Sequence, residues 1–256
     1  MAETILEIKA LSKSFAGREG VAQAVREVAF SIDAGECLGL VGRSGCGKST
    51  VARLVSRMLE PDGGQIILAG QDIAHANGRD LAKVYDILQM VFQQPEESFD
   101  PRRTIGWSVG EPLRHHGVEA EEARSKAGEL LADVGLSEVF IDRYPHEISG
   151  GECQRAALAR ALALQPKLLI CDEITSALDV TVQQEILALL QKLIRKQKLA
   201  CLFITHDLNL LSGFAKRTAV MSNGRLVEMA DTESLLLEPQ SEAARQLLAS
   251  DLFFDF

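Results

Sequence analysis

The segment Gly42-Arg43-Ser44-Gly45-Cys46-Gly47-Lys48-Ser49-Thr50 fits the pattern GxxxxGK[ST]. An apolar run from Glu36 to Val41, typical of a strand, precedes it, and helically spaced apolar residues follow from Lys48 to Leu59. In this setting glycines let backbone N–H groups point inward around a phosphate, and the helix start adds a favourable dipole. We call residues 42–50 the phosphate loop. A flexible glycine and serine turn is the plainer alternative.

Two side chains of the phosphate loop have predicted tasks of their own. Lys48 is expected to reach the β- and γ-phosphates of a nucleotide, and the Ser49 hydroxyl is expected to coordinate Mg²⁺. The candidate nucleotide-binding residues within the loop are Gly42, Arg43, Ser44, Gly45, Cys46, Gly47, Lys48, Ser49 and Thr50.

A second apolar run ends in two carboxylates. Leu168 to Cys171 is typical of a strand buried on both faces, and Asp172 and Glu173 follow it directly. Asp172 is placed to hold Mg²⁺ through water, and Glu173 to accept a proton from the water that attacks the γ-phosphate. Adjacent carboxylates in a loop are often only solvated charges, but the phosphate loop upstream favours the functional interpretation.

Strands and helices alternate along the chain. The pair Asn223-Gly224 accepts positive φ at both positions and predicts a hairpin between residues 217–222 and 225–229. Residues 117–163 are rich in Ala and Glu and almost wholly helical in pattern, which predicts a helical insertion into an α/β fold with a mainly parallel sheet. The other expected elements are strands at 65–68 and 201–204, a long amphipathic helix at 179–196 and a short helix at 207–215.

Composition excludes several classes of protein. The chain has 256 residues, 46% hydrophobic and 25% charged, with a formal net charge of −9. Such a chain is a poor nucleic-acid binder, because phosphate backbones are bound by clustered positive charge. It has no apolar run long enough to span a bilayer and opens without a basic leader, so a cytoplasmic location is expected. Its five cysteines lie mostly in apolar runs, which favours buried free thiols.

A further motif points to a family. Ser149-Gly150-Gly151-Glu152 resembles the signature of ATP-binding subunits of ABC transporters, usually Leu-Ser-Gly-Gly-Gln, with Ile148 and Glu152 as departures. Physically the motif is a second helix start that can bind an anion, although capping of the following helix accounts for its residues as well. The resemblance implies that these four residues contact ATP held by an opposing subunit, so a monomer should be a poor ATPase.

Other positions match the same family one by one. The resemblance implies that Gln93 senses Mg²⁺ and the attacking water, and that His206 contacts the γ-phosphate and orients the base Glu173. It also implies that Asp179 lies in a loop that meets the other subunit, where it is fit to cap the following helix. Phe15 is the expected ring to stack on adenine, or else a core residue. Ile174 stands where the family usually has proline.

The resemblance covers nearly the whole chain and implies its architecture. It implies a P-loop NTPase core with a mainly parallel sheet, an N-terminal antiparallel β part and an inserted α-helical subdomain. Residues 1–256 would form a single ABC ATPase domain, with 1–92 and 165–256 as the α/β core and about 93–164 as the helical subdomain. ATP and Mg²⁺ are the implied ligands.

Within the family, four segments resemble the dipeptide, oligopeptide and nickel importers. Arg43 and residues 200–208 favour the second ATPase of a nickel system, for nickel or a nickel chelate, with di- or oligopeptide import as the alternative. The chain stops at Phe256 without the Cys-bearing tail of many oligopeptide subunits, which weakens the oligopeptide interpretation but leaves dipeptide and metallophore uptake open. The four segments are Leu40 to Gly47, Ser98 to Thr104, Glu111 to Leu113 and Tyr144 to His146.

The resemblance also implies partners. These are a second ABC ATPase subunit in a heterodimer, two transmembrane permease subunits met near Ser98 to Thr104, and a separate substrate-binding protein. The chain would be peripheral at the cytoplasmic face of the inner membrane. A non-transport ABC ATPase should carry a heptad insertion or zinc cysteines, which this sequence lacks. A regulatory nucleotide-binding module stays an alternative because of Glu152 and Ile174.

Overall fold

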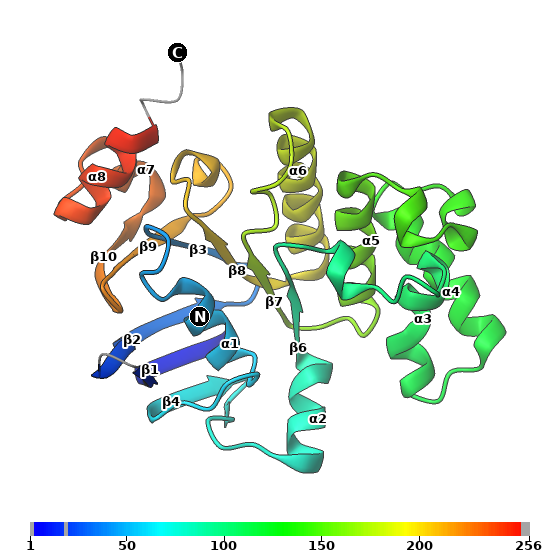
Figure 1. The fold of residues 1–256 in the computed structure, drawn as a ribbon, viewed down its shortest axis with the longest axis horizontal. Coiled ribbons are helices and arrows are strands. Elements are labelled where there is room, and N and C mark those ends of the chain that lie inside the picture. The colour runs from blue at the N-terminus through cyan, green and yellow to red at the C-terminus, as the bar shows by residue number, and fades with distance from the viewer. Residues whose placement is uncertain (1–2, 18–19, 252–256) are drawn as a thin grey trace.

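A computed structural model describes residues 3–17 and 20–251 (Figure 1). Residues 1–2 and 252–256 lie outside the described part. The expectations about a leader and about a C-terminal tail concern these residues. The described chain forms two sheets, with a group of helices to one side of the larger sheet. No helix within this part is long and apolar enough to cross a membrane.

The larger sheet has six strands in the order β10-β9-β3-β8-β7-β6. Neighbouring strands from β9 to β6 are parallel, and β10 pairs with β9 as the antiparallel partner in a hairpin. Strands β3, β7 and β8 are buried along their whole length, as apolar strands covered on both faces should be. The bounds are β3 Cys37–Val41, β6 Leu88–Val91, β7 Leu168–Asp172, β8 Ala200–Thr205, β9 Arg217–Ser222 and β10 Arg225–Asp231.

The smaller sheet is antiparallel and mostly N-terminal, with strand order β2-β1-β4-β5. One hydrophobic cluster joins it to helix α1 and to one face of the larger sheet, through residues such as Ile8, Leu38, Leu54 and Ile66. Helix α1 is thereby fixed between the two sheets, with the phosphate loop at its start. The bounds are β1 Thr4–Gly17, β2 Gly20–Asp33, β4 Gly63–Leu68, β5 Gln71–Asp72 and α1 Lys48–Val55.

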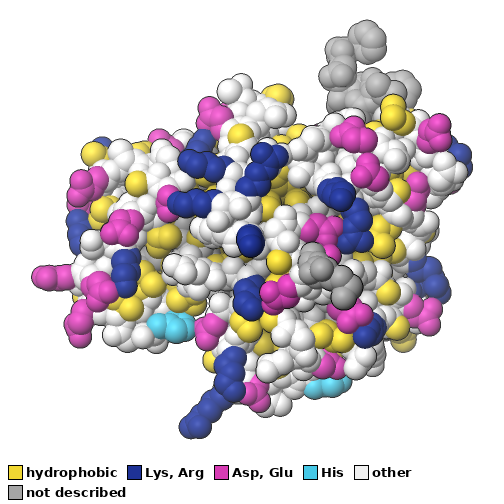
Figure 2. Space-filling model, turned by 180° about the vertical axis from the view of Figure 1, so that it is seen from behind, with side chains coloured by type: hydrophobic (Ala, Val, Ile, Leu, Met, Phe, Trp, Pro, Cys, Tyr) yellow, Lys and Arg dark blue, Asp and Glu magenta, His cyan; other side chains and the backbone are white. Residues whose placement is uncertain are grey.

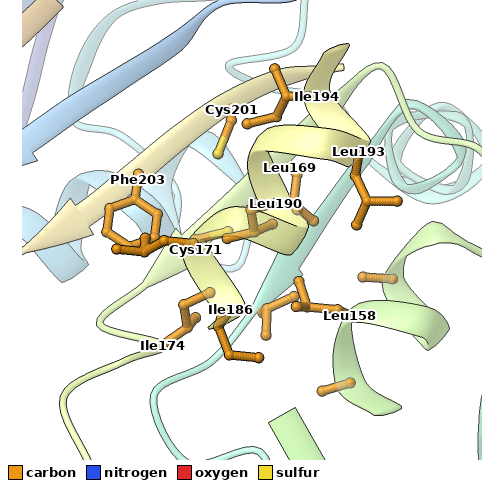
Figure 3. Close-up of a cluster of buried hydrophobic side chains, with 14 of the residues drawn as sticks. Leu158, Leu169, Cys171, Ile174, Ile186, Leu190, Leu193, Ile194, Cys201 and Phe203 are labelled. Atoms are coloured by element: carbon orange, nitrogen blue, oxygen red, sulfur yellow. The ribbon is translucent and has the colours of Figure 1, made fainter. Parts of the chain in front are cut away.

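The other face of the larger sheet is covered by helices. Buried side chains of α5 and α6, among them Leu158, Ile186 and Leu190, pack on Leu169 and Phe203 of the strands (Figure 3). Helices α3, α4 and α5 pack on one another at the side of the molecule (Figure 1). The bounds are α2 Gly78–Ile87, α3 Ile105–His115, α4 Ala120–Asp133, α5 Gly150–Leu162, α6 Val180–Gln197, α7 Thr232–Leu237 and α8 Glu242–Asp251, with single 3₁₀ turns at Glu96–Ser98, Glu138–Asp142, Pro145–Glu147 and Asn209–Leu211.

The predicted fold class is confirmed, and two of the expected helices are shorter than their sequence patterns indicate. Helix α1 ends at Val55 rather than Leu59, since Arg57 takes a left-handed conformation with φ of 57°. The helix expected at 207–215 shrinks to the turn Asn209–Leu211, and Gly213 follows it with φ of 66°. The predicted hairpin turn is present, because Asn223 and Gly224 both have positive φ between β9 and β10.

The surface and the cysteines follow the composition. On the face opposite that of Figure 1, Lys and Arg side chains are interspersed with Asp, Glu and hydrophobic side chains (Figure 2). All five cysteines are free thiols, and four of them are buried, as small hydrophobic residues of the core would be. The fifth, Cys46, lies in the phosphate loop and is partly exposed.

Candidate nucleotide site

The register of the larger sheet brings the predicted site residues to one edge. Val41, the last residue of β3, pairs with Thr205 at the end of β8, and Asp172 at the end of β7 pairs with Ile204. Parallel strands that end together deliver their following loops to the same place. The phosphate loop, Glu173 and His206 therefore lie at one edge although the sequence separates them widely.

The phosphate loop has the backbone of an anion site. Gly47 precedes α1 with φ of 113°, and a Cβ at this position would overlap the carbonyl oxygen of Ala24 on β2. Glycine is therefore required there. Helix α1 begins with no side-chain cap and no acidic residue in its first turn, so its first N–H groups are left for an anion.

Lys48 lies folded back over the phosphate loop. Its side chain is 4% exposed, and its Nζ donates to the carbonyl oxygens of Gly42 at 2.6 Å and Arg43 at 3.4 Å. The same Nζ is 3.7 Å from Oε1 of Glu173. The loop thus holds a buried positive charge that can form charge-assisted hydrogen bonds with phosphate oxygens, and a carboxylate lies beside it.

Oxygen ligands suited to Mg²⁺ converge beside the loop. The Ser49 hydroxyl donates to Oδ1 of Asp172 at 3.1 Å, and both residues, together with Gln93, line a cavity of about 440 Å³. Burial raises the pKa of Asp172 above its ordinary value, with Glu173 adding to this, while Ser49 and Lys48 oppose it. A buried carboxylate with hydroxyl and amide oxygens nearby fits a hard divalent cation.

Glu173 occupies a strained position between two basic groups. Its φ of 51° is left-handed, and its N–H donates to the Ile204 carbonyl at 3.0 Å, which holds the turn in place. Its Oε1 is 3.7 Å from Nζ of Lys48, and its Oε2 is 3.7 Å from Nδ1 of His206. The Glu173 side chain is 17% exposed and the His206 side chain 54% exposed, an arrangement suited to a base that takes a proton from water.

Ser176 links two of the predicted residues, which the sequence did not show. Gln93 Nε2 donates to Ser176 Oγ at 3.1 Å, and Ser176 Oγ donates to the backbone oxygen of Glu173 at 2.9 Å. The loop that carries Gln93 is therefore tied to the turn that carries Glu173. A lone serine at this position has no sequence pattern that marks this role.

The motif at residues 149–152 forms a capping box at the start of α5. Ser149 N and Oγ both donate to Oε2 of Glu152 at 2.8 Å, and Glu152 N donates to Ser149 Oγ at 3.4 Å. The capping interpretation of Ser149 is thus correct locally. Among the described residues, no hydrogen bond or ion pair joins this motif to the phosphate loop of the same chain.

The structure also gives the positions of three further predicted residues, Phe15, Asp179 and Ile174. Phe15 pairs with Ala22 on the β1–β2 hairpin, whose Ala24 adjoins the phosphate loop, and its ring is 42% exposed, so it is not a core residue. Asp179 caps α6 by accepting from the backbone N–H of Val182 at 3.0 Å. Ile174 is 1% exposed and packs in the core beneath α6 (Figure 3).

The chain is similar to known proteins in both sequence and structure. A family model described as ABC transporter matches residues 25–176. The oligopeptide transport ATP-binding protein AppF of Bacillus subtilis is 42% identical over 97% of this chain and 78% of its own length. The glutathione import ATP-binding protein GsiA of Salmonella typhi is 41% identical over 97% of this chain, which spans 41% of that longer protein.

Solved structures agree with these matches. The dimeric ATP-binding cassette MJ0796, in a post-hydrolysis state with ADP and Pi, superposes with a TM-score of 0.82 and 29% identity over 89% of this chain and 99% of that one. The cbiO1 protein of Clostridium perfringens has the same TM-score of 0.82 at 23% identity over 99% and 96% of the two chains, which supports the fold. With its phosphate loop, capped signature helix and carboxylate turn, the chain belongs to the ABC transporter family as an ATP-hydrolysing, ATP-binding subunit.

Proposed function

We propose that this chain is the ATPase of an ABC importer that takes up short peptides. The observation that carries its chemistry is the position of the Glu173 carboxylate, 3.7 Å from both Lys48 Nζ and His206 Nδ1. The substrate class follows from relatives named for oligopeptide transport and glutathione import, and glutathione is itself a short peptide. These names favour the peptide alternative over nickel, to which Arg43 and residues 200–208 point.

The site residues divide the hydrolysis of ATP among them. Lys48 and the N–H groups of the phosphate loop hold the phosphates, and Phe15 offers an exposed ring for adenine. Glu173 accepts a proton from the attacking water, and His206 orients this carboxylate and contacts the γ-phosphate. These roles suit the geometry, since a base must lie beside the phosphates and keep a path to water.

Mg²⁺ would be held by Ser49, Gln93 and Asp172, which line one cavity. When bound, the ion would neutralise negative charge on the phosphates. Ser49 and Asp172, which hydrogen-bond to each other in this structure, would offer it oxygen ligands, directly or through water. The hydrogen bonds from Gln93 to Ser176 and from Ser176 to Glu173 would connect this site to the turn that carries the base.

The signature residues Ser149, Gly150, Gly151 and Glu152 act on a nucleotide of an opposing subunit. They begin α5 while the phosphate loop of the same chain begins α1, and MJ0796, described as a dimer, supports a contact between subunits. We propose a second ABC ATPase as the opposing subunit, in a heterodimer that Asp179 helps to form. Two permease subunits contact residues 98–104 at the cytoplasmic face of the inner membrane, and a separate binding protein delivers the cargo.

Glu173→Gln tests the chemistry. The substitution keeps the size of the side chain and removes the base, so we expect hydrolysis to fall by about 10²–10⁴-fold while ATP binding persists and an ATP-bound dimer accumulates. The measurement is phosphate release together with gel filtration in ATP. Glu129→Gln, an exposed glutamate of α4, is the matched control and should hydrolyse ATP normally. Unchanged hydrolysis in Glu173→Gln would show that another group is the base.

Uptake by cells tests the substrate class. Deleting the gene should abolish uptake of a radiolabelled tripeptide and leave uptake of radiolabelled nickel unchanged, and a plasmid copy should restore peptide uptake. A plasmid copy with Glu173→Gln should not restore it. Loss of nickel uptake alone would reinstate nickel, or a nickel chelate, as the cargo.

A further inference from the structure

Gln154 carries a buried amide without a partner. The residue is 1% exposed in the second turn of α5, and among the described residues its Nε2 has no hydrogen-bond partner. Buried donors in native proteins are nearly always satisfied, because an unsatisfied one loses its hydrogen bonds to water and gains nothing in return. An exception inside an enzyme therefore needs a reason.

The amide lies where three segments meet. Gln154 and Gly150 of α5 line a cavity of about 250 Å³ together with residues 93–97 and with Ile174, Ala177 and Leu178. Each segment carries or adjoins a site residue: Gln93 lies in the first, the signature begins α5, and the third follows Glu173. A donor at this junction can sense how the three segments are placed.

The acceptor that faces α5 across this junction is Glu96. A Cβ built on Gly150 would lie 3.5 Å from Oε1 of Glu96, which puts the carboxylate against the first turn of the helix. The charge of Glu96 also acts on Cys153 of α5. Burial, and after it the negative charge of Glu96, raises the pKa of the Cys153 thiol to about 12. Within the part of the chain that the structure describes, no hydrogen bond joins the Glu96 carboxylate to α5, so its oxygens are available to Gln154 after a shift of the loop.

We infer that Gln154 is a positioning residue: its amide binds Glu96 across this cavity in the ATP-bound state and thereby fixes the loop that carries Gln93. This inference rests on the proposed function. In this structure the donor is unsatisfied, so an arrangement that gives it a partner is favoured, and we expect that arrangement when Gln93 is drawn toward the nucleotide and its metal. The position of Gln93 is then coupled to the position of α5, the helix that the signature begins.

The test uses the complete transport complex, with Gln154→Met in this subunit. Methionine keeps the length and fits the apolar walls but removes the donor. We expect kcat for ATP to fall about tenfold, KM for ATP to stay within twofold, and the melting temperature to be unchanged or higher. Gln191→Met is the matched control, because the Gln191 amide already donates to the Gly213 carbonyl at 2.6 Å, and its kcat should not change.

A double-mutant cycle with Glu96→Met completes the test. If the two side chains act through one bond, Glu96→Met lowers kcat by a similar factor and the double variant is no slower than either single variant. Wild-type kcat in Gln154→Met, or a double variant whose loss is the product of the single losses, would overturn the inference. Gln154→Glu, which keeps the shape without the donor, decides the point if Gln154→Met does not fold, and must also lose kcat.

The results that would contradict the proposed function differ from those that would contradict the role of Gln154. A wild-type complex that does not hydrolyse ATP, or that is indifferent to Glu173→Gln, contradicts the proposed function. A complex that hydrolyses ATP and depends on Glu173 but is indifferent to Gln154→Met contradicts only the role of Gln154.

Discussion

Asp172 carries a negative charge that the fold by itself disfavours. The residue is 9% exposed, and burial raises its pKa although Ser49 and Lys48 work in the opposite direction. A carboxylate in this condition gains most when a cation enters the site. If Asp172 holds a metal ion as proposed, its charge should lower the stability of the metal-free protein and raise its affinity for the ion.

Asp172→Asn should therefore stabilise the chain and impair its metal binding. Because the folded-state pKa is raised, the native protein holds the proton more tightly than the unfolded chain does. The stability this provides is complete below the ordinary carboxyl pKa of about 4 and is lost as pH rises through the folded-state value. At pH 7 without metal the variant should melt at a higher temperature than wild type, and this gain should vanish near pH 3.

Thermal unfolding in chelator at pH 7 and pH 3 measures the first effect. Titration of Mg²⁺ into the ATPase reaction measures the second, with an expected 10- to 100-fold loss of apparent affinity, about the size seen when the surroundings of a metal site are altered. A melting temperature that falls at pH 7 would mean that the charge of Asp172 is stabilising.

Glu152 is the departure in the signature whose effect the structure makes predictable. Its carboxylate accepts from both the N–H and the hydroxyl of Ser149, the groups expected to meet a phosphate of the opposing subunit. Glu152→Gln keeps an oxygen for the capping box but removes a negative charge near phosphate. We expect the same melting temperature and a several-fold lower KM for ATP in the complex. An unchanged KM would place Glu152 away from the nucleotide.

At the scale of elements, α6 connects the site to the core. Its apolar side packs beneath the sheet through Ile186 and Leu190, and Asp179 begins it with a side-chain cap (Figure 3). The helix start therefore fixes the loop at residues 174–178 that follows Glu173. Ile174, buried at the foot of α6, anchors the same loop by packing where the family usually relies on proline.

Two substitutions at Asp179 separate capping from subunit contact. Asp179→Ala removes the cap and should cost about 1 kcal/mol of unfolding free energy, measured by urea denaturation. Asp179→Asn keeps the cap and should be nearly as stable as wild type. If Asp179 also meets the other subunit through its charge, Asp179→Asn should weaken ATP-dependent dimerisation in the Glu173→Gln background. Equal dimerisation would confine the residue to capping.

At the scale of the whole molecule, the signature and the phosphate loop begin two different helices. The signature starts α5, the phosphate loop starts α1 between the two sheets, and among the described residues no hydrogen bond or ion pair joins them.

The net charge of −9 opposes the binding of an anion such as ATP. On the proposed function, local N–H groups, Lys48 and a metal ion would have to attract the phosphates against this unfavourable overall field.

ATPase activity of the isolated chain should therefore depend on its concentration. If each site needs the signature of another subunit, the rate per chain should rise in proportion to concentration at low concentration and then level off. Adding the partner ATPase should shift this rise to lower concentrations. Phosphate release measured from nanomolar to micromolar chain tests this, and a constant rate per chain would mean that one chain contains a complete site.

The sequence by itself determined what depends on local pattern. Four features could be predicted because each is a short continuous segment whose backbone conformation and chemistry depend on a few neighbouring residues. They are the phosphate loop, the apolar strands, the Asn223-Gly224 turn and the signature. These segments sufficed for the fold class and the family. The ends of α1 and of the turn near Asn209 could not be predicted in the same way. Residues such as Arg57 take a left-handed conformation that their residue type does not indicate.

Tertiary structure alone decided how distant groups meet. Ser49 and Asp172 are 123 residues apart and share a hydrogen bond because β3, β8 and β7 end in register. The link through Ser176, the burial of Ile174 and the unsatisfied amide of Gln154 depend in the same way on segments packed from different parts of the chain. No local pattern encodes such contacts, since sheet register and helix packing are fixed by the whole core at once.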